Sequence, residues 1–411
     1  MASVAIVHYA EELPSDPGFT SGRYASLARA LVRLGHEPIR IAPSYSHRQK
    51  KQRTTPRREL KVDTGSVVLV ETPGYISHRG FARVRHLNTF RLGAAKALAE
   101  LRPDVAIVML PPMGILRMAT QLSAGTRTTW IADVEDLWPD AQIATTNGIT
   151  RSALRLGASL IHKQVSRDLR LASGIVAISR EYLRWAFERY PAGRQLPTRV
   201  IPLGTPVDFD DKPEEVSSRH GVVFVGTLSN HFAFEKLVDA WRIFVTENHD
   251  LAAKHPLTIL GDGPWLNRLR ETARDVPFMH VEGRVPHDEA MHLMRQSALA
   301  LAPYREQARM GLPNKLFEYV AAGLPIVSTL RGEMAEFLDT HDLGTTVTER
   351  DANGYASSIR TWLLNSTARS KVANEGPALV KRHYSHDVLA EQLARFILET
   401  HKRKSARETQ R

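Results

Sequence analysis

The residues best suited to chemistry lie in one short stretch that joins a glycine–proline turn to a lysine and a glutamate. Residues 311–323 read GLPNKLFEYVAAG, and a β-branched run follows. Proline costs no hydrogen bond in the first turn of a helix, so the pattern predicts a helix that begins near Pro313 and ends at Gly323. The free backbone N–H groups and the positive dipole at that helix start favour an anion such as a diphosphate.

Two charged side chains would add to this site. Lys315 brings a full positive charge to the start of the helix. Glu318 lies one turn later, where its carboxylate can accept hydrogen bonds from sugar hydroxyls. The stretch therefore predicts a site for a phosphorylated, hydroxyl-rich ligand. An ordinary crossover helix with Lys315 and Glu318 on its surface is the structural alternative.

An acidic cluster is the second candidate site. Asp133, Glu135, Asp136 and Asp140 surround a Trp-Pro pair directly after the predicted strand 128–132. Such carboxylates can hold a metal ion, orient a substrate hydroxyl or stabilise a developing positive charge. They can equally cap the segment that follows. Glu135 and Asp136 are the catalytic candidates, and the chemical and capping interpretations both stay open.

Gly18, Gly22 and Arg23 follow the first predicted strand, residues 3–8. The glycines would let the backbone approach a phosphate, and Arg23 would contact that phosphate or a second substrate. A flexible turn before an amphipathic helix is the alternative. A G-x-G-x-x-G pattern does not follow this strand, which argues against a nicotinamide dehydrogenase. The sequence also has no P-loop, no nucleophile elbow and no helical zinc pair.

The charge of the sequence is concentrated in two places. Its 411 residues include no cysteine, which excludes disulfides, thiolate metal sites and a cysteine nucleophile. Lys and Arg number 55 against 44 Asp and Glu, a net charge of +11. Residues 47–61 contain seven basic residues and one glutamate, and residues 401–411 contain five and one. We therefore expect a nearly neutral globular body with two basic attachments rather than a nucleic-acid-binding face.

Short apolar runs alternate with amphipathic patterns from end to end, which predicts βαβ units and parallel sheets. A turn-rich stretch that begins near Gly204 separates two such series. The expected fold class is α/β, with two Rossmann-like, doubly wound domains that face a central cleft. We expect an N-terminal domain over residues 1–203, a second domain over 204–384, a helix over 385–400 that packs back on the first domain, and a basic disordered tail over 401–411.

The order and spacing of these motifs resemble the retaining glycosyltransferases of the GT-B fold, family 4. The resemblance covers nearly the whole chain, about residues 3–398. The Asp-Leu-Trp-Pro sequence that begins at Asp136 resembles a signature of the WbuB-like subgroup, which is associated with bacterial surface glycans. The other matching stretches are Pro17–Ala42, Val222–Trp241, Leu257–Arg270 with its Gly-Asp-Gly-Pro turn, Val281–Tyr304 and Gly311–Ser328.

The resemblance implies that the second domain binds a nucleotide-sugar, with a UDP-sugar expected, and that the first domain handles the acceptor. It gives catalytic roles to Glu135, Asp136 and Lys315 and places Gly22 and Arg23 on the acceptor side. It implies that no metal ion or other cofactor is needed. The implied donor-binding residues are Gly18, Gly226, Thr227, Asp262, Arg284, Val285, Met310, Gly311, Leu312, Pro313, Asn314, Lys315 and Glu318.

The sequence departs from the family pattern at three positions. Met310 stands where a glutamate that contacts the donor sugar is usual, eight residues before Glu318. Thr227 and Phe232 stand where an arginine and a lysine usually hold the diphosphate. A diphosphate still needs counter-charge. We expect that charge to come from Lys315, with help from Arg305 or Arg309.

The expected activity is transfer of a hexosyl or N-acetylhexosaminyl group to a hydroxyl acceptor with retention of anomeric configuration. The acceptor would be a lipid-linked or polysaccharide intermediate of bacterial cell-surface glycan synthesis. A GT-B nucleotide-sugar epimerase, and a non-catalytic scaffold that binds membrane or nucleic acid, are the alternatives. We expect neither a targeting segment nor a membrane-spanning apolar run in this sequence. We expect a cytoplasmic protein that docks on the anionic inner face of the membrane through residues 47–61 and the tail, with no nucleic-acid partner.

Overall fold

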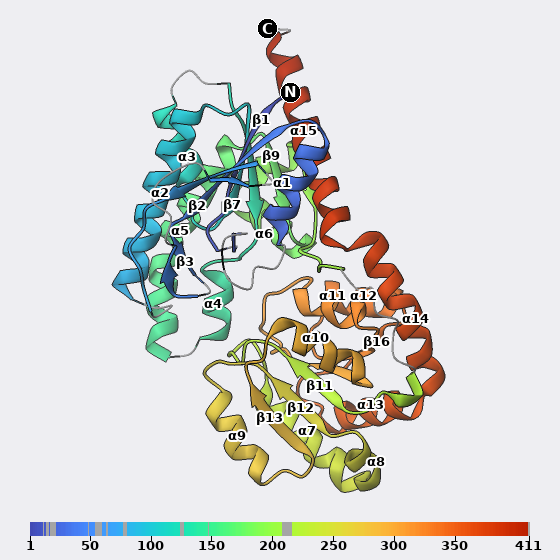
Figure 1. The fold of residues 1–411 in the computed structure, drawn as a ribbon. Helices are drawn as coiled ribbons and strands as arrows, with labels where there is room; N and C mark the ends of the chain where they lie inside the picture. The colour runs from blue at the N-terminus through green and yellow to red at the C-terminus, as the bar shows by residue number, and fades with distance from the viewer. Residues whose placement is uncertain are drawn as a thin grey trace. The chain divides into compact units, whose positions relative to one another are not determined.

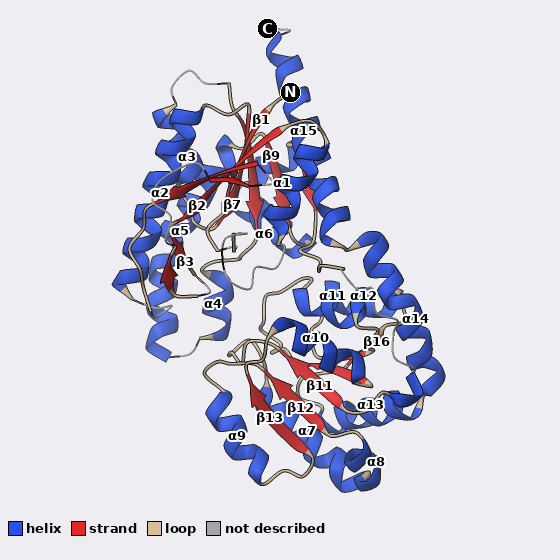
Figure 2. Cartoon of the chain, viewed as in Figure 1, coloured by secondary structure: helices blue, strands red, loops and turns tan. Residues whose placement is uncertain are grey.

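The computed structural model describes residues 1–10, 12–13, 16, 22–47, 49–53, 60–62, 65–76, 80–123, 127–146, 148–207 and 216–409. The chain divides into two compact units (Figure 1). Unit 1 comprises residues 1–140, 152–206 and 386–411, and unit 2 comprises residues 141–151 and 207–385. In each unit, helices cover a central sheet (Figure 2).

Unit 1 is built on an eight-stranded sheet in the order β10-β9-β8-β7-β1-β2-β6-β5. The β5–β6 pair is antiparallel, and the other described pairs are parallel. The strand order reverses between β1 and β7, which makes their carboxyl ends the expected ligand-binding edge. The strands are β1 (Ser3–Val7), β2 (Glu37–Pro43), β5 (Leu60–Val62), β6 (Gly65–Val70), β7 (Val105–Leu110), β8 (Thr129–Val134), β9 (Gly174–Ala177) and β10 (Thr198–Val200).

Helices cover this sheet because its strands are apolar on both faces. α1 (Arg23–Arg33) and α15 (His386–Thr409) pack together on one face, and α2 (Phe81–Leu101) and α3 (Ile115–Leu122) pack together on the other (Figure 1). A small hairpin, β3 (Tyr45–Ser46) with β4 (Lys51–Gln52), follows β2. Unit 1 also contains α6 (Arg180–Arg189) and the 3-10 turn Pro191–Gln195, whereas α4 (Asp140–Thr145) and α5 (Gly148–Leu171) each contain residues of both units.

Unit 2 contains a six-stranded parallel sheet in the order β13-β12-β11-β14-β15-β16. Its order reverses between β11 and β14. The strands are β11 (Val222–Val225), β12 (Leu257–Leu260), β13 (Met279–Gly283), β14 (Leu299–Ala302), β15 (Ile326–Ser328) and β16 (Gly344–Thr346). The helices are α7 (Phe234–Glu247), α8 (His249–Lys254), α9 (Leu266–Arg274), α10 (His287–Gln296), α11 (Asn314–Ala321), α12 (Glu333–Thr340), α13 (Ala352–Leu364) and α14 (Ser366–His383), with a 3-10 turn at Val216–Ser218.

The expected α/β class with two parallel-sheet, Rossmann-like domains is confirmed. The basic tail is a correction, because α15 continues through Thr409 where we expected disorder after residue 400. The physical reason is that the end of this helix docks on unit 1. His401 Nδ1 lies 2.9 Å from Thr129 Oγ1, and Lys404 Nζ donates to the Arg127 and Thr128 carbonyls at 3.2 and 2.7 Å.

The basic stretch 47–61 is also more structured than an attachment, within its described residues 47, 49–53 and 60–61. Part of it forms β4, and β5 begins at Leu60. Arg53 is buried against Asp16, with Nη2 to Oδ2 at 2.7 Å, and its Nη1 donates to the Pro43 carbonyl at 2.6 Å. Residues 48 and 54–59 lie outside the described part of the chain. Arg53 therefore places one positive charge of this stretch inside unit 1.

Candidate functional site

The carboxyl edge of the unit 2 sheet gathers the sequence-predicted donor residues. Loops that follow parallel strands emerge at the same edge, so residues far apart in the sequence meet there. Four strands contribute. Gly226 and Thr227 follow β11, Asp262 follows β12, Arg284 and Val285 follow β13, and Met310, Gly311, Leu312, Pro313, Asn314, Lys315 and Glu318 follow β14.

The Lys315 side chain lies directly against the backbone of Gly226. A Cβ atom at Gly226 would overlap Cε and Nζ of Lys315, and the residue has a positive φ of 153°. Only glycine suits both conditions. Gly261 repeats the arrangement, because a Cβ there would overlap the Gly226 carbonyl oxygen. These close approaches bring the cation of α11 to the end of β11, at the point where the strand order reverses.

The Lys315 ammonium is a desolvated charge without a fixed partner. Burial lowers the pKa of Lys315, and the Glu318 carboxylate on the same helix partly opposes this shift. Its Nζ lies 5.9 Å from the centroid of the Phe224 ring. Within the described residues, no hydrogen bond or ion pair is formed by Lys315. A partly buried cation of this kind is stabilised when an anion binds beside it.

Tyr319 is a structural residue of this site that the sequence analysis missed. Its buried hydroxyl accepts a hydrogen bond from the Val225 N–H at 2.9 Å and lies 3.4 Å from the Leu301 carbonyl. One side chain thereby ties α11 to the ends of β11 and β14. Its place one turn after Lys315, on the apolar face of the helix, is the signal that could have identified it.

Arg305 does not serve as the free counter-charge that we expected. Its Nη1 lies 2.7 Å from Glu235 Oε1 and 3.8 Å from Glu349 Oε1. Its Nε also donates to the Asn230 carbonyl at 3.1 Å. Two carboxylates therefore balance this charge in the absence of ligand, which makes Arg305 a brace between loops.

In unit 1, Arg23 is committed to a buried ion pair. Its Nε and Nη2 donate to the Asp133 carboxylate at 3.0 and 3.1 Å, and its Nη1 donates to the Ile201 and Pro202 carbonyls at 3.0 and 3.1 Å. Asp133 is fully buried and also accepts a hydrogen bond from Tyr24 at 3.1 Å. Burial alone would lower the pKa of Arg23, but the neighbouring carboxylates raise it.

The four carboxylates of the acidic cluster have different surroundings. Glu135 Oε1 lies 3.1 Å from Arg23 Nε, so this catalytic candidate shares the arginine with Asp133. Asp140 accepts hydrogen bonds from Trp185 and Arg189, both at 2.7 Å, and lies 2.9 Å from His162 Nε2. Asp140 therefore ties α4 to α5 and α6. Among the described residues, no group of three or more His, Asp or Glu side chains is arranged to hold a metal ion.

Asp136 is the carboxylate of this cluster best suited to proton chemistry near neutral pH. Burial raises its pKa to about 6, although a hydrogen bond from the Leu137 backbone and the charge of Arg83 oppose the shift. Asp136 follows β8 and therefore lies at the carboxyl edge of the unit 1 sheet. A group with such a pKa exchanges its proton within the physiological range.

Gly18 and Gly22 are the remaining predicted residues of unit 1. Gly22 precedes α1 as its N-cap, and its carbonyl accepts a hydrogen bond from the Ser26 N–H at 3.0 Å. Gly18 lies outside the described residues.

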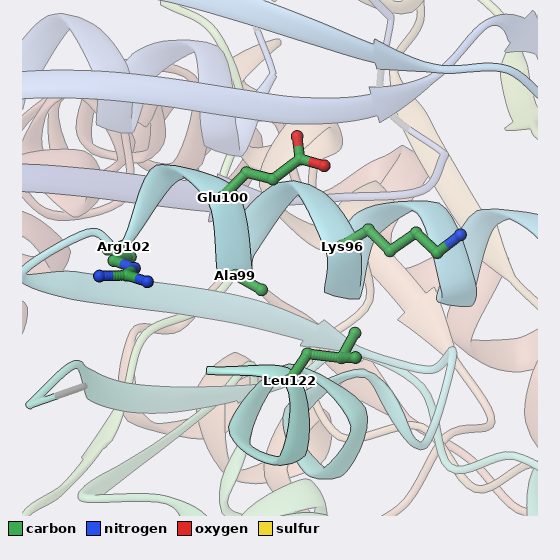
Figure 3. A pocket seen from close by; sticks show the side chains of 5 residues that line it. All are labelled: Lys96, Ala99, Glu100, Arg102 and Leu122. Atoms are coloured by element: carbon green, nitrogen blue, oxygen red, sulfur yellow. The ribbon is translucent and has the colours of Figure 1, made fainter. Parts of the chain in front are cut away.

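A hollow in unit 1 lies where α2 and α3 end, at the amino edge of the sheet, away from the candidate residues (Figure 3). Its lining residues are Lys96, Ala99, Glu100, Arg102 and Leu122.

A structural role for Arg23 predicts a large loss of stability on substitution. Arg23→Leu would leave the buried Asp133 carboxylate without its cation and should lower the free energy of unfolding of unit 1 by about 3–5 kcal/mol. Arg33→Leu, at a half-exposed position of the same helix, is the control and should cost less than about 1 kcal/mol. Denaturant unfolding followed by circular dichroism measures both. Equal stability of the two variants would contradict the structural role.

Two protein-family models match the chain. The glycosyl transferase 4-like domain matches residues 21–204, and the glycosyl transferases group 1 model matches residues 219–365. The chain is 27% identical over 146 residues to the putative colanic acid biosynthesis glycosyltransferase WcaL of Escherichia coli K12. This match covers 34% of the chain and 36% of WcaL, so the chain is aligned with about a third of that relative's length.

Solved structures resemble the chain over nearly its whole length. Sucrose-phosphate synthase from Thermosynechococcus elongatus has a TM-score of 0.72 at 14% identity, covering 97% of this chain and 99% of that one. Anabaena Alr3699/HepE in complex with UDP-glucose has a TM-score of 0.62 at 12% identity, covering 97% and 100%. The resemblance of the chain to the WbuB-like subgroup stays a prediction. The chain therefore shares the two-domain GT-B fold of these structures, and its first part resembles a glycosyl transferase 4-like domain while its second part resembles a glycosyl transferases group 1 domain.

Proposed function

We propose that this protein is a retaining glycosyltransferase that moves a sugar from a UDP-sugar to a hydroxyl acceptor. The observation that carries the proposal is the desolvated Lys315 ammonium, held against Gly226 at the start of α11. A diphosphate there would meet the lysine and the helix N-terminus together. UDP as the nucleotide is supported by the similarly folded Anabaena protein, whose structure contains UDP-glucose.

The remaining donor contacts are assigned by their place on the same edge. Glu318, whose side chain forms no hydrogen bond within the described residues, would accept hydrogen bonds from the ribose hydroxyls. The exposed Arg284 and the partly buried Val285, after β13, would border the base. Met310 packs against the unit 2 core and would present an apolar surface to the sugar. The donor would thus be held by one cation and many backbone groups.

The proposed chemistry needs no protein nucleophile. The bond between the anomeric carbon and the leaving diphosphate breaks, and the acceptor oxygen bonds to the same face of that carbon. The acceptor proton passes to an oxygen of the leaving phosphate. Lys315 and the α11 dipole would stabilise the negative charge that develops on the diphosphate. Asp136 would orient the acceptor hydroxyl, and the scheme includes no metal ion.

The acceptor class that we propose is an intermediate of bacterial surface-glycan synthesis that is presented at a membrane. The name of the E. coli relative, which refers to colanic acid biosynthesis, supports the glycan part. Unit 1 exposes three large apolar side chains shortly before and within the first turn of α2, namely Ile76, Phe81 and Val84, which are 90%, 94% and 55% exposed. The exposed Arg85 lies beside them on α2. Apolar side chains next to a cation suit an anionic lipid surface. No helix within the described residues is long and apolar enough to cross a bilayer.

Binding of UDP should depend on Lys315. Saturation with UDP should raise the melting temperature, because a ligand at about 100 times its Kd adds about 2.7 kcal/mol of stability. Lys315→Met should weaken UDP binding about 10- to 100-fold, since it removes a charge-assisted contact with the diphosphate. Lys254→Met, at an exposed position at the end of α8, is the control. Unchanged affinity in Lys315→Met would refute this donor site, and epimer formation from a UDP-sugar without an acceptor would favour the epimerase.

The transfer rate should fall in acid as Asp136 is protonated. Its pKa is raised, so its ionised form is lost as the pH falls through about 6, and kcat/KM should decline there. Asp136→Asn should lower kcat about 100-fold and remove this limb of the profile. Glu100→Gln, at the opposite edge of the sheet, should keep the parent value of kcat and the decline of the rate in acid. A profile that is the same in Asp136→Asn and the parent would exclude this role.

Membrane docking predicts binding to vesicles that contain phosphatidylglycerol, at low salt. The double variant Ile76→Ser/Phe81→Ser should reduce the bound fraction several-fold, because both side chains would leave water on docking. Leu122→Ser, which changes a 53% exposed apolar residue at the far end of α3, should have no effect. Co-sedimentation gives the bound fraction. Equal binding to neutral and anionic vesicles, or equal loss in both variants, would exclude this surface.

A further inference from the structure

A second group of cationic and phenolic side chains lies at the carboxyl edge of the unit 1 sheet, and neither the family matches nor the predicted residues assign it a role. Its members come from four segments that follow or connect strands. We call them the tyrosine–lysine cluster: Tyr9 after β1, His47 and Lys50 between β3 and β4, Tyr75 after β6, and Arg83 on α2.

Tyr75 is the centre of this cluster. Its hydroxyl contacts His47 Nδ1 and lies 3.4 Å from the Tyr9 hydroxyl. Lys50 Nζ lies 4.5 Å from the centroid of its ring. Arg83 Nη2 donates to the Tyr9 hydroxyl at 3.4 Å. Two cations and two phenol hydroxyls therefore converge on one small region.

The Lys50 ammonium is buried and has no hydrogen-bond partner within the described residues. Burial lowers the pKa of Lys50, and the positive charge of Arg83 lowers it further. His86, which packs edge-on against Tyr75, also has its pKa lowered by burial. Burying an ammonium group beside a second cation is unfavourable in free energy, and a bound anion would offset this cost.

The cluster lies within electrostatic range of the proposed acceptor-orienting carboxylate. The charge of Arg83 acts on Asp136 and opposes the rise of its pKa. Asp136 and Tyr75 each follow a parallel strand of the same sheet, so both lie at its carboxyl edge. An anionic group held beside Arg83 would thus lie on the same edge of the sheet as Asp136.

We propose that the tyrosine–lysine cluster binds a phosphate group of the acceptor. Lys50 supplies a point charge, the Arg83 guanidinium supplies paired N–H donors, and the hydroxyls of Tyr9 and Tyr75 supply neutral hydrogen bonds. The identification of the bound phosphate as part of the acceptor rests on the proposed function, whereas the anion site itself does not. The donor diphosphate has a separate candidate site on unit 2.

Binding of inorganic pyrophosphate to the full chain tests the anion site directly. Isothermal titration is performed with the donor site saturated by UDP, and UDP binding is measured separately. Lys50→Met should weaken pyrophosphate binding about 10- to 100-fold, the loss expected for one charge-assisted contact, and should leave the Kd for UDP unchanged. Lys51→Met, at the adjacent exposed position, should bind pyrophosphate like the parent. Equal affinity in Lys50→Met and Lys51→Met overturns the proposal.

Arg83→Met provides a second test if Lys50→Met fails to fold, as judged by circular dichroism. It should weaken pyrophosphate binding to a similar extent, whereas Lys96→Met, at an exposed position on the same helix, should not. If saturation with UDP by itself abolishes pyrophosphate binding in the parent, the anion occupies the donor site and the proposal is wrong. If UDP does not bind but Lys50→Met still weakens pyrophosphate binding, the proposed function fails and the anion site stands.

Transfer assays separate the two sources of the phosphate. One acceptor carries a short polyprenyl diphosphate, a second is a phosphorylated sugar without lipid, and a third is an uncharged glycoside of the same sugar. Lys50→Met should lower kcat/KM about tenfold or more for a phosphorylated acceptor and leave the uncharged one unaffected. Preference for either phosphorylated form supports the site and identifies the source. Equal losses with all three acceptors overturn the proposal.

Discussion

Parallel pairing of the strands is the constraint on which every candidate site of this protein depends. In a parallel sheet the chain must cross over after each strand, so all the loops that follow strands emerge at one edge. In unit 2 this edge unites Gly226, Asp262, Arg284 and the segment that leads to Lys315. In unit 1 it unites Tyr9, Tyr75 and Asp136 in the same way. The topology thus determines which side chains meet at each edge, and those side chains then determine the chemistry.

The cations at these edges differ in how their charge is balanced, and the difference separates structural from binding roles. Arg23 and Arg305 have carboxylate partners at 3.0 and 2.7 Å, so their charge is satisfied before any ligand arrives. Lys315 and Lys50 have lowered pKa values because of burial and have no ion-pair partner within the described residues. A protein retains a desolvated, unbalanced cation at a free-energy cost, which binding of an anion offsets.

The sequence predicted the fold better than the surroundings of its charged residues. Alternating apolar and amphipathic patterns identified both parallel sheets, and the turn before α11 located its start near Pro313. The same reasoning treated the two basic stretches, residues 47–61 and 401–411, as attachments. Lys404 instead caps carbonyls of unit 1, and Arg53 is buried against Asp16. Charge runs are solvated unless tertiary neighbours accept them, and no local pattern announces such neighbours.

The sequence by itself determined the two-domain α/β architecture and the position of Lys315 and Glu318 on one helix, because periodicity and helix signals act over a few residues. Tertiary structure alone decided which charges are free. Arg23 meets Asp133 across 110 residues of sequence, and Tyr9 meets Tyr75 across 66. Such pairs form because strand order brings their loops together, and the strength of their interaction depends on burial that the whole unit creates.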